Sequence, residues 1–582
     1  MLNASGKIPE RTKLLLLSLV VGLCSGLAAV LLNWMISGIR QMLEFGHAAG
    51  YHWMYLVLPG IGMLLSYLIV RYIVKDNIGH GVTKVLVAVS KNESKIKPHN
   101  MWSSLVTSAL TIGFGGSVGA EAPIVYTGAA IGSNFGRYFG LSYRSITVLL
   151  GCGAAGAVAG IFKAPLAGVL FTMEILLFNI SMSSMLPLLL STVSATVVAY
   201  LFNGQTFSFQ CSLTPFSMVN IPFYVILGVM CGFGSLYFLR MTLHLEDRIA
   251  RRMPNDFVRW LICSVLLGVL IFMVPMLYGE GYGSLEGLLN NDITSGDTPL
   301  SFLLRSPWGV PAFFAIAFFL KVFAMTFTNA GGGVGGTFGP TLFEGAILGF
   351  VVARVLNIIM ANSGFSVPEQ NFVLVGMAGL MAGVMQAPMT AIFLIAEMSG
   401  GYDLFLPLIL TSAVSFGVTR IFEKYSIYSK RIANTGELLT HDNDKAVLTL
   451  LKTEDLVKDK YPHVSISASL RDIIPVVSDS TVAAFPVLDR YGRFCGMLEM
   501  DDVRKYFFQK SLYNTLYVKD IMKEAPAYVR VDEPMESVMT KFDETDAWRL
   551  PVVADDMKYL GFISKSRILM AYREELKVIS ND

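Results

Sequence analysis

Charge is scarce in this sequence and unevenly distributed. Charged residues make up only 15% of the 582 residues, whereas hydrophobic residues make up 53%. A water-soluble protein of this length needs more charge, so we expect most of the chain to face lipid. Charged residues become dense only from about Asp442 onward, and the formal net charge of +2 gives no reason to expect a nucleic-acid partner. The composition therefore predicts a membrane domain followed by a soluble domain.

Cysteines and catalytic motifs are equally sparse. The six cysteines form no CxxC pair and no metal-ligand spacing, so we expect neither a disulfide framework nor a metal site. The membrane part contains no HExxH motif, which leaves a membrane enzyme only as a remote alternative. No cofactor is expected to be required. The first apolar run, from Leu14 to about Ile39, is too long for a signal-peptide core and predicts a retained transmembrane helix.

The hydrophobic part is internally duplicated. Residues 115–132 (GGSVGAEAPIVYTGAAIG) align without gaps with residues 332–349 (GGVGGTFGPTLFEGAILG), and the shared positions are glycine, alanine and proline. A second pair of blocks follows, beginning at Gly151 and Val375. Its matched positions are Ala164-Pro165 with Ala387-Pro388 and Glu174 with Glu397.

Loop charges indicate that the two copies are inverted in the membrane. Residues 44–52 contain no Lys or Arg, but the corresponding loop 240–259 of the second copy is rich in arginine. The lysine-rich loop 75–97 corresponds to residues 279–300, which carry acidic residues and no base. Positively charged loops stay in the cytoplasm, so equivalent loops lie on opposite sides. We predict an α-helical, multi-pass membrane protein with inverted repeats and broken helices, a transporter or channel architecture.

The same rule orients the chain. Lys7, Arg11 and Lys13 precede the first helix and place the N-terminus in the cytoplasm, and the C-terminus is expected there too. The predicted segments are a cytoplasmic N-terminus (1–10), membrane half 1 (11–203), an external linker (204–218), membrane half 2 (219–437), a linker (438–452) and two modules of the tail (453–510 and 518–577).

Four glycine-rich segments interrupt the apolar runs. Broken backbone at membrane depth persists only where protein or a water-filled cavity covers it. The free N–H groups of a helix that begins at such a break, with the helix dipole behind them, form an anion site without a fixed cation. For a single break, glycine packing between helices would be the simpler interpretation, but four breaks in an inverted repeat favour an anion pore. The segments are GHGVT (79–83), GAEAP (119–123), GEGYG (279–283) and GGTFGP (335–340).

Proline and glutamate add detail to these breaks. Pro123 and Pro340 are predicted to occupy the first position of the following helices. Glu121 is a carboxylate inside a membrane domain and is functional by default. We expect it to act as a tethered competitor of the anion, with simple helix capping as the alternative. For Glu174 and Glu397, packing or capping is the favoured interpretation.

These residues resemble the CLC family of chloride channels and proton/chloride exchangers, whose signatures are written GSGIP, GREGP and GxFxP. The resemblance covers roughly residues 10–435 and implies a chloride pore in each subunit of a homodimer, gated by the external glutamate Glu121. Fluoride and nitrate remain alternative anions. The implied anion-binding residues are His80, Gly81, Gly119, Glu121, Thr337 and Phe338 (through backbone N–H groups), and Tyr428 (through its hydroxyl).

Three departures from the family pattern bear on the mechanism. His80 stands where the family serine donates a hydroxyl, and Ala120 replaces the arginine of the second signature. Many exchangers carry two consecutive glutamates, the second of which relays protons, but here Glu174 is followed by Ile175. Isoleucine carries no proton, which favours a channel. A proton-coupled chloride antiporter of the same fold is the alternative.

The tail contains a repeat of its own. Residues 485–507 and 550–572 each predict a strand, a turn, a strand and a helix, and the two resemble a tandem α/β pair of CBS modules. The resemblance implies an adenine-nucleotide site at Asp502 and Ser564, although neither copy has the complete Thr/Asp signature. A structural dimerisation module is the favoured interpretation. Because CBS pairs also accompany cation channels, such a channel is a further remote alternative.

Overall fold

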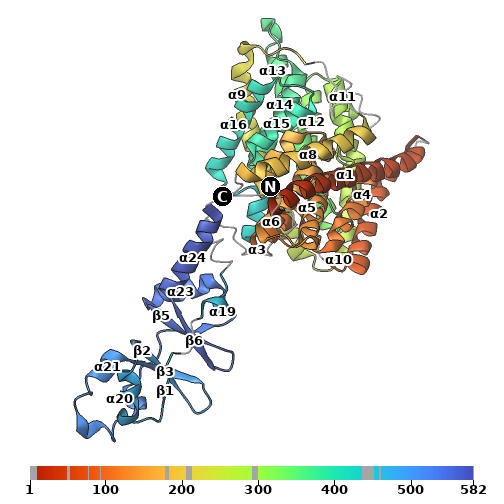
Figure 1. Cartoon of the computed structure of the whole chain (residues 1–582). Coiled ribbons are helices and arrows are strands. Elements are labelled where there is room, and N and C mark those ends of the chain that lie inside the picture. Colours follow the sequence, from red (N-terminus) through yellow and green to blue (C-terminus); the bar gives the residue numbers. More distant parts are fainter. Residues whose placement is uncertain are drawn as a thin grey trace. The chain divides into compact units, whose positions relative to one another are not determined.

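The computed structural model separates into two units, Met1–Leu439 and Thr440–Asp582. It describes residues 9–48, 53–76, 78–91, 94–176, 182–204, 213–290, 299–434, 451–457, 461–480 and 482–580. Within these residues the first unit is helical, and all strands lie in the C-terminal unit, which is blue in Figure 1. The predicted division into a helical membrane part and an α/β tail is confirmed.

The helical unit is built from two successive sets of helices. Among the described residues, nine helices are long and apolar enough to cross a membrane, and they include the predicted N-terminal one. The first set is α1 (Glu10–Ala48), α2 (Met54–Leu68) with a π-helical end (Ile69–Val74), α3 (Gly81–Lys91), α4 (Ser103–Gly113), α5 (Glu121–Tyr138), α6 (Tyr143–Phe162), α7 (Pro165–Phe171) with a π-helical end (Thr172–Leu176), and α8 (Met182–Asn203). The second set is α9 (Ile221–Arg252), α10 (Asp256–Met273), α11 (Tyr282–Leu289), α12 (Gly309–Ala330), α13 (Phe338–Ile359), α14 (Glu369–Met385), α15 (Pro388–Met398), α16 (Phe405–Phe422) and α17 (Ile427–Asn434).

The two repeat blocks meet at equivalent residues. Gly119 and Gly336 occupy the same position in their blocks and form an antiparallel bridge. The N–H of Gly119 donates to the carbonyl of Gly336 over 3.0 Å, and the N–H of Gly336 donates back over 2.7 Å. Because both bonds join equivalent residues, a local two-fold axis relates the halves at this bridge.

A second reciprocal pair surrounds the bridge. The hydroxyl of Thr328 accepts from the N–H of Ser117 over 3.1 Å, and the hydroxyl of the equivalent Thr111 accepts from the N–H of Val334 over 3.0 Å. Both threonines are fully buried. The bonds satisfy backbone donors that the breaks leave without a helical partner, which explains how irregular backbone is tolerated inside an apolar unit.

The two equivalent glutamates of the second blocks cap each other's short helices. Glu174 accepts from the N–H groups of Met389 and Thr390 at the start of α15, over 3.0 and 2.7 Å. Glu397 accepts from Leu166 and Ala167 at the start of α7, over 3.1 and 2.9 Å. The predicted capping role is confirmed.

The predicted position of two prolines was wrong. Helix α5 begins at Glu121 and α13 at Phe338, so Pro123 and Pro340 are third in their helices. A proline is still tolerated there, because the N–H groups of a helix's first turn have no intrahelical acceptor to lose. Pro165 and Pro388, by contrast, are the first residues of α7 and α15.

The tail consists of two similar modules. Each has a three-stranded sheet in which the first strand pairs parallel and the third antiparallel to the middle one. The first module contains β1 (Val464–Ser465), α20 (Leu470–Ser478), β2 (Ala484–Leu488), β3 (Phe494–Glu499), α21 (Met500–Arg504) and α22 (Val518–Ile521). The second contains β4 (Val529–Arg530), α23 (Met535–Thr545), β5 (Arg549–Val553), β6 (Tyr559–Ser564) and α24 (Lys565–Ser580). Helix α19 (Thr453–Leu456) precedes the first module in sequence, but its Leu456 packs in the apolar core of the second.

The two modules also meet through equivalent residues. The N–H of Phe494 donates to Met557 over 2.9 Å, and the N–H of Tyr559 donates to Gly492 over 3.2 Å. The rings of Phe494 and Tyr559 stack with centroids 6.3 Å apart. One shared apolar cluster therefore joins the modules, and its buried members are Leu488, Phe494, Met497, Val553, Tyr559 and Phe562.

Candidate anion site and pore

The carboxylate of Glu121 lies at the start of a helix other than its own. Glu121 is the first residue of α5 and is only 2% exposed. Its Oε2 accepts from the N–H of Gly339, in the first turn of α13, over 3.2 Å. Its Oε1 accepts from the hydroxyl of Tyr282 on α11 over 2.6 Å. The carboxylate thus occupies a helix N-terminus at the two-fold bridge, where an anion is favoured.

Gly119 provides space at this site and does not provide a donor. Its N–H is already bonded to the carbonyl of Gly336, so it is not free to donate to an anion. A Cβ on Gly119 would lie 2.0 Å from Oε2 of Glu121 and 2.8 Å from the nitrogen of Gly339. Only glycine lets the carboxylate reach the N-terminus of α13.

Thr337 and Phe338 form the start of α13. Thr337 is the N-cap and Phe338 the first helical residue, and each is 1% exposed. The Phe338 ring packs between Phe162 and Phe171, with centroids 5.5 and 6.2 Å away. These aromatic contacts fix the start of the helix, whose first-turn N–H groups have no intrahelical acceptor.

Beside the start of α13 lie two buried hydroxyls that lack a hydrogen-bond partner among the described residues. Tyr428 is the second residue of α17, is 1% exposed, and lies close to Thr337. In the described part of the chain, neither Oη of Tyr428 nor Oγ1 of Thr337 has a hydrogen-bond partner. Burying an unpaired hydroxyl is unfavourable, and an anion that accepts from both would remove that cost. The arrangement supports the predicted role of Tyr428, Thr337 and Phe338.

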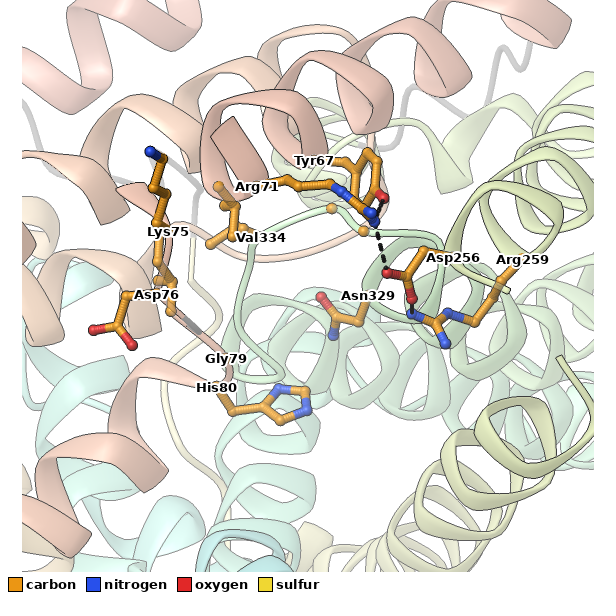
Figure 2. Close-up of a pocket in the computed structure, with 14 residues that line it drawn as sticks. Tyr67, Arg71, Lys75, Asp76, Gly79, His80, Asp256, Arg259, Asn329 and Val334 are labelled. Carbon is orange, nitrogen blue, oxygen red and sulfur yellow. Dashed lines mark hydrogen bonds and ion pairs between the residues drawn. The ribbon is translucent and has the colours of Figure 1, made fainter. Parts of the chain in front are cut away.

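His80 lines a cavity of about 660 Å³ on the side of the lysine-rich loop. Figure 2 shows the cavity with Asp256 between Arg71 and Arg259, to which it is bonded over 3.2 and 2.6 Å. His80 Nε2 lies 3.7 Å from Glu246 Oε1. The cavity is lined by residues from the ranges 67–80, 256–259 and 329–334. Sequence reasoning missed it because these ranges are far apart in the sequence.

Gly81 allows two helices to approach closely. It is the first residue of α3, and a Cβ there would lie 2.3 Å from the carbonyl oxygen of Ala122 on α5. Gly81 therefore brings the start of α3, with His80 before it, against the helix that carries Glu121.

A second group of charged residues surrounds Glu121 and was also missed. Glu280 Oε1 accepts from the N–H of Ala120 over 3.1 Å, and Glu280 Oε2 lies 3.7 Å from Arg40. Lys321 is fully buried and donates to Ser117 Oγ over 2.8 Å. The only sequence signal was the GEGYG break, which contains Glu280 and Tyr282.

The position of the family's second glutamate holds an apolar side chain. Ile175 is 6% exposed and lies in the π-helical turn after α7. The neighbouring Glu174 is bonded to the start of α15. Neither residue offers an uncommitted carboxylate.

The candidate nucleotide residues of the tail already have protein partners. Asp502 pairs with Lys523 over 2.7 Å and with Lys505 over 3.3 Å, and the hydrogen bond from Lys523 is the main reason that the pKa of Asp502 is lowered. The hydroxyl of Ser564 accepts from the N–H of Arg567 over 3.3 Å at the start of α24. No group of three or more His, Cys, Asp or Glu residues that could hold a metal ion occurs in the described ranges.

A multi-pass helical unit with a candidate anion site at its broken helices is typical of a transport protein for small anions. The family model "Voltage gated chloride channel" matches residues 61–420, and the model "CBS domain" matches residues 454–509 and 518–574. The chain therefore belongs to the CLC family of chloride-transporting membrane proteins and carries two CBS domains. The family resemblance seen in the sequence is confirmed.

Similar proteins include named exchangers. A protein of Ralstonia nicotianae named as a ClcB-like chloride channel is 27% identical over 409 residues, which are 69% of this chain and 91% of that protein. The "H(+)/Cl(-) exchange transporter ClcA" of Vibrio campbellii is 25% identical over 455 residues, which are 74% of this chain and 91% of that protein. The ClcA exchange transporter of Vibrio cholerae is 27% identical over 453 residues, which are 72% and 89% of the two chains.

Solved structures share the fold. A slow cyanobacterial Cl⁻/H⁺ antiporter is similar with a TM-score of 0.63 at 23% identity, covering 74% of this chain and 98% of that one. A eukaryotic CLC transporter is similar with a TM-score of 0.60 at 16% identity, covering 96% of this chain and 98% of that one.

Proposed function

We propose that this protein exchanges chloride for protons across a membrane. The observation that carries the proposal is the position of Glu121, a titratable carboxylate in the anion site at the start of α13. The exchange transporters of Vibrio campbellii and Vibrio cholerae support it over the channel function favoured by the sequence.

The exchange follows from competition at the start of α13. An ionised Glu121 takes the N–H of Gly339 and excludes chloride. A proton on the carboxylate removes the charge that the N–H groups attract, so the side chain leaves and chloride takes its place. The backbone N–H groups of Thr337 and Phe338 and the hydroxyl of Tyr428 then hold the anion. Each replacement of the carboxylate by chloride thereby couples the movement of chloride to the movement of a proton.

A chloride channel is the second candidate. It is favoured by Ile175, which offers no proton relay, and by the engagement of Glu174 with α15. For exchange without a glutamate at position 175, protons would have to reach Glu121 through water. The remaining expectations also belong to the proposal: cytoplasmic termini, a homodimer with one pore per subunit, and a CBS pair that acts mainly as a structural module.

The first prediction concerns Glu121. In reconstituted vesicles, Glu121→Ala is expected to keep chloride flux and to lose both its dependence on pH and any proton movement, because the tethered competitor is gone. Chloride flux and internal pH are measured together. Glu286→Ala, at an exposed position on α11, is the control and should behave as the wild type. Chloride flux with an unchanged pH dependence in Glu121→Ala would remove Glu121 from the mechanism.

A further inference from the structure

The fourth glycine-rich break, Gly279–Gly283, has no place among the three family signatures. Two of its glycines have positive φ, Gly279 at 64° and Gly281 at 90°. A Cβ on Gly281 would lie 2.4 Å from the ring of Phe343. Only glycine fits this tight turn, which directs both Glu280 and Tyr282 toward the start of α5.

This segment is bonded to the loop that carries the gate. The N–H of Gly279 donates to the carbonyl of Gly115 over 3.1 Å, and Lys321 Nζ donates to the carbonyl of Gly279 over 3.0 Å. Glu280 accepts from the N–H of Ala120, directly before Glu121. The backbone of Gly279–Gly283 is thus held in place independently of the side chain of Tyr282.

We propose that Tyr282 is a latch that holds the Glu121 carboxylate in the anion site and sets how strongly chloride must compete to displace it. The hydroxyl of Tyr282 donates to Oε1 of Glu121 over 2.6 Å, while the N–H of Gly339 binds the other oxygen over 3.2 Å. The hydroxyl bond is the shorter of the two, and a hydrogen bond to an ionised group is stronger than one between neutral groups. Tyr282 is therefore a positioning residue that favours the state in which the Glu121 carboxylate occupies the anion site.

The latch acts within a charged environment that several elements provide. The titratable or charged groups that face Glu121 are Glu280 before α11, Tyr282 on α11, Lys321 on α12 and Tyr428 on α17, with Arg40 of α1 behind Glu280. Tyr282 differs from the others because its hydroxyl bonds directly to the carboxylate.

The inference rests on the proposed competition between Glu121 and chloride, and the two can be tested separately. Chloride binding to the purified full-length protein is measured by calorimetry. Glu121→Ala should bind chloride more tightly than the wild type, and the absence of that change would count against the competition itself. Tyr282→Phe keeps the ring and removes only the hydroxyl, so it should bind chloride about tenfold more tightly than the wild type.

A double-variant cycle identifies the latch. Tyr282→Phe should have no effect on chloride affinity in the Glu121→Ala background, because there is no carboxylate left to hold. Tyr237→Phe is the matched control, because its hydroxyl donates to Phe319 over 3.0 Å away from the gate. Unchanged affinity in Tyr282→Phe would overturn the latch. An equal change with and without Glu121 would also overturn it and would show that Tyr282 acts on the anion directly.

Discussion

The carboxylates of Glu121 and Glu174 each lie at the start of a helix other than their own, yet their surroundings differ and indicate different roles. Glu174 accepts from two N–H groups and from the hydroxyl of Thr390. Glu121 accepts from one N–H and from one tyrosine hydroxyl on a different helix, next to the unpaired hydroxyls of Thr337 and Tyr428. A fully bonded carboxylate stays in place, whereas one beside unpaired donors can be replaced by an anion.

At the residue scale, the sequence could predict Glu121 but not the parts played by Tyr282 and Lys321. A carboxylate between small residues in an apolar segment is expensive enough to be conspicuous. Tyr282 is one of 23 tyrosines, and its partner Glu121 lies in the other repeat. No local sequence pattern therefore predicts the hydrogen bond between them. Lys321 is a single buried cation in an apolar helix, and its role depends on Ser117 and Gly279 in distant segments.

At the scale of elements, carboxylates accept hydrogen bonds from backbone N–H groups at the starts of four of the interrupted helices. Glu280 accepts from the N-cap of α5, Glu121 from the first turn of α13, Glu397 from α7 and Glu174 from α15. Each carboxylate comes from a different part of the chain. They satisfy donors that would otherwise be unpaired in an apolar interior and so make short helices tolerable there.

Capping by Glu174 and Glu397 is expected to stabilise the protein to a similar extent on both sides of the two-fold axis. Removal of either carboxylate leaves two backbone donors unpaired, so Glu174→Ala and Glu397→Ala should each lower the free energy of unfolding by about 1–3 kcal/mol. Thermal unfolding in detergent, followed by tryptophan fluorescence, measures the change. Glu286→Ala is the exposed control and should unfold like the wild type. If one variant unfolds like the control while the other does not, the symmetric capping is wrong.

Some elements follow directly from sequence pattern and others do not. Pro165 and Pro388 were recognised from sequence as matched positions of the repeat, and each begins a helix, where proline is favoured. The π-helical ends Ile69–Val74 and Thr172–Leu176 were not recognised, because a shift from i+4 to i+5 bonding leaves no periodic signal in a uniformly apolar run.

At the scale of the whole molecule, duplication occurs twice. The membrane repeats meet through Gly119 and Gly336, and the CBS modules meet through Phe494 and Tyr559. The sequence revealed the membrane duplication because identical small residues recur in order, and the tail duplication because the pattern of strand, turn, strand and helix recurs. It could not reveal that equivalent residues bond to one another, since that depends on where the two-fold axis passes.

The structure of the CBS pair leads us to expect weak or no binding of adenine nucleotides. Asp502 is held by Lys523 and Lys505, and Ser564 is bonded at the start of α24, so a ribose and phosphates would have to displace existing bonds. Calorimetric titration of the full-length protein with ATP should show no tight binding, in the wild type or in the matched variant Asp502→Asn. Tight binding that Asp502→Asn abolishes would contradict a purely structural role.

Proton coupling is the property of the whole molecule that most directly separates exchange from conduction. With purified wild-type protein in planar bilayers, the reversal potential is measured under a fixed chloride gradient while a pH gradient is imposed. Because the exchange of Glu121 for chloride moves a proton with each cycle, the reversal potential should shift with the pH gradient, and Glu121→Ala should abolish the shift. A wild-type reversal potential that follows chloride alone, at every pH gradient, would contradict exchange and would establish the channel that Ile175 favours.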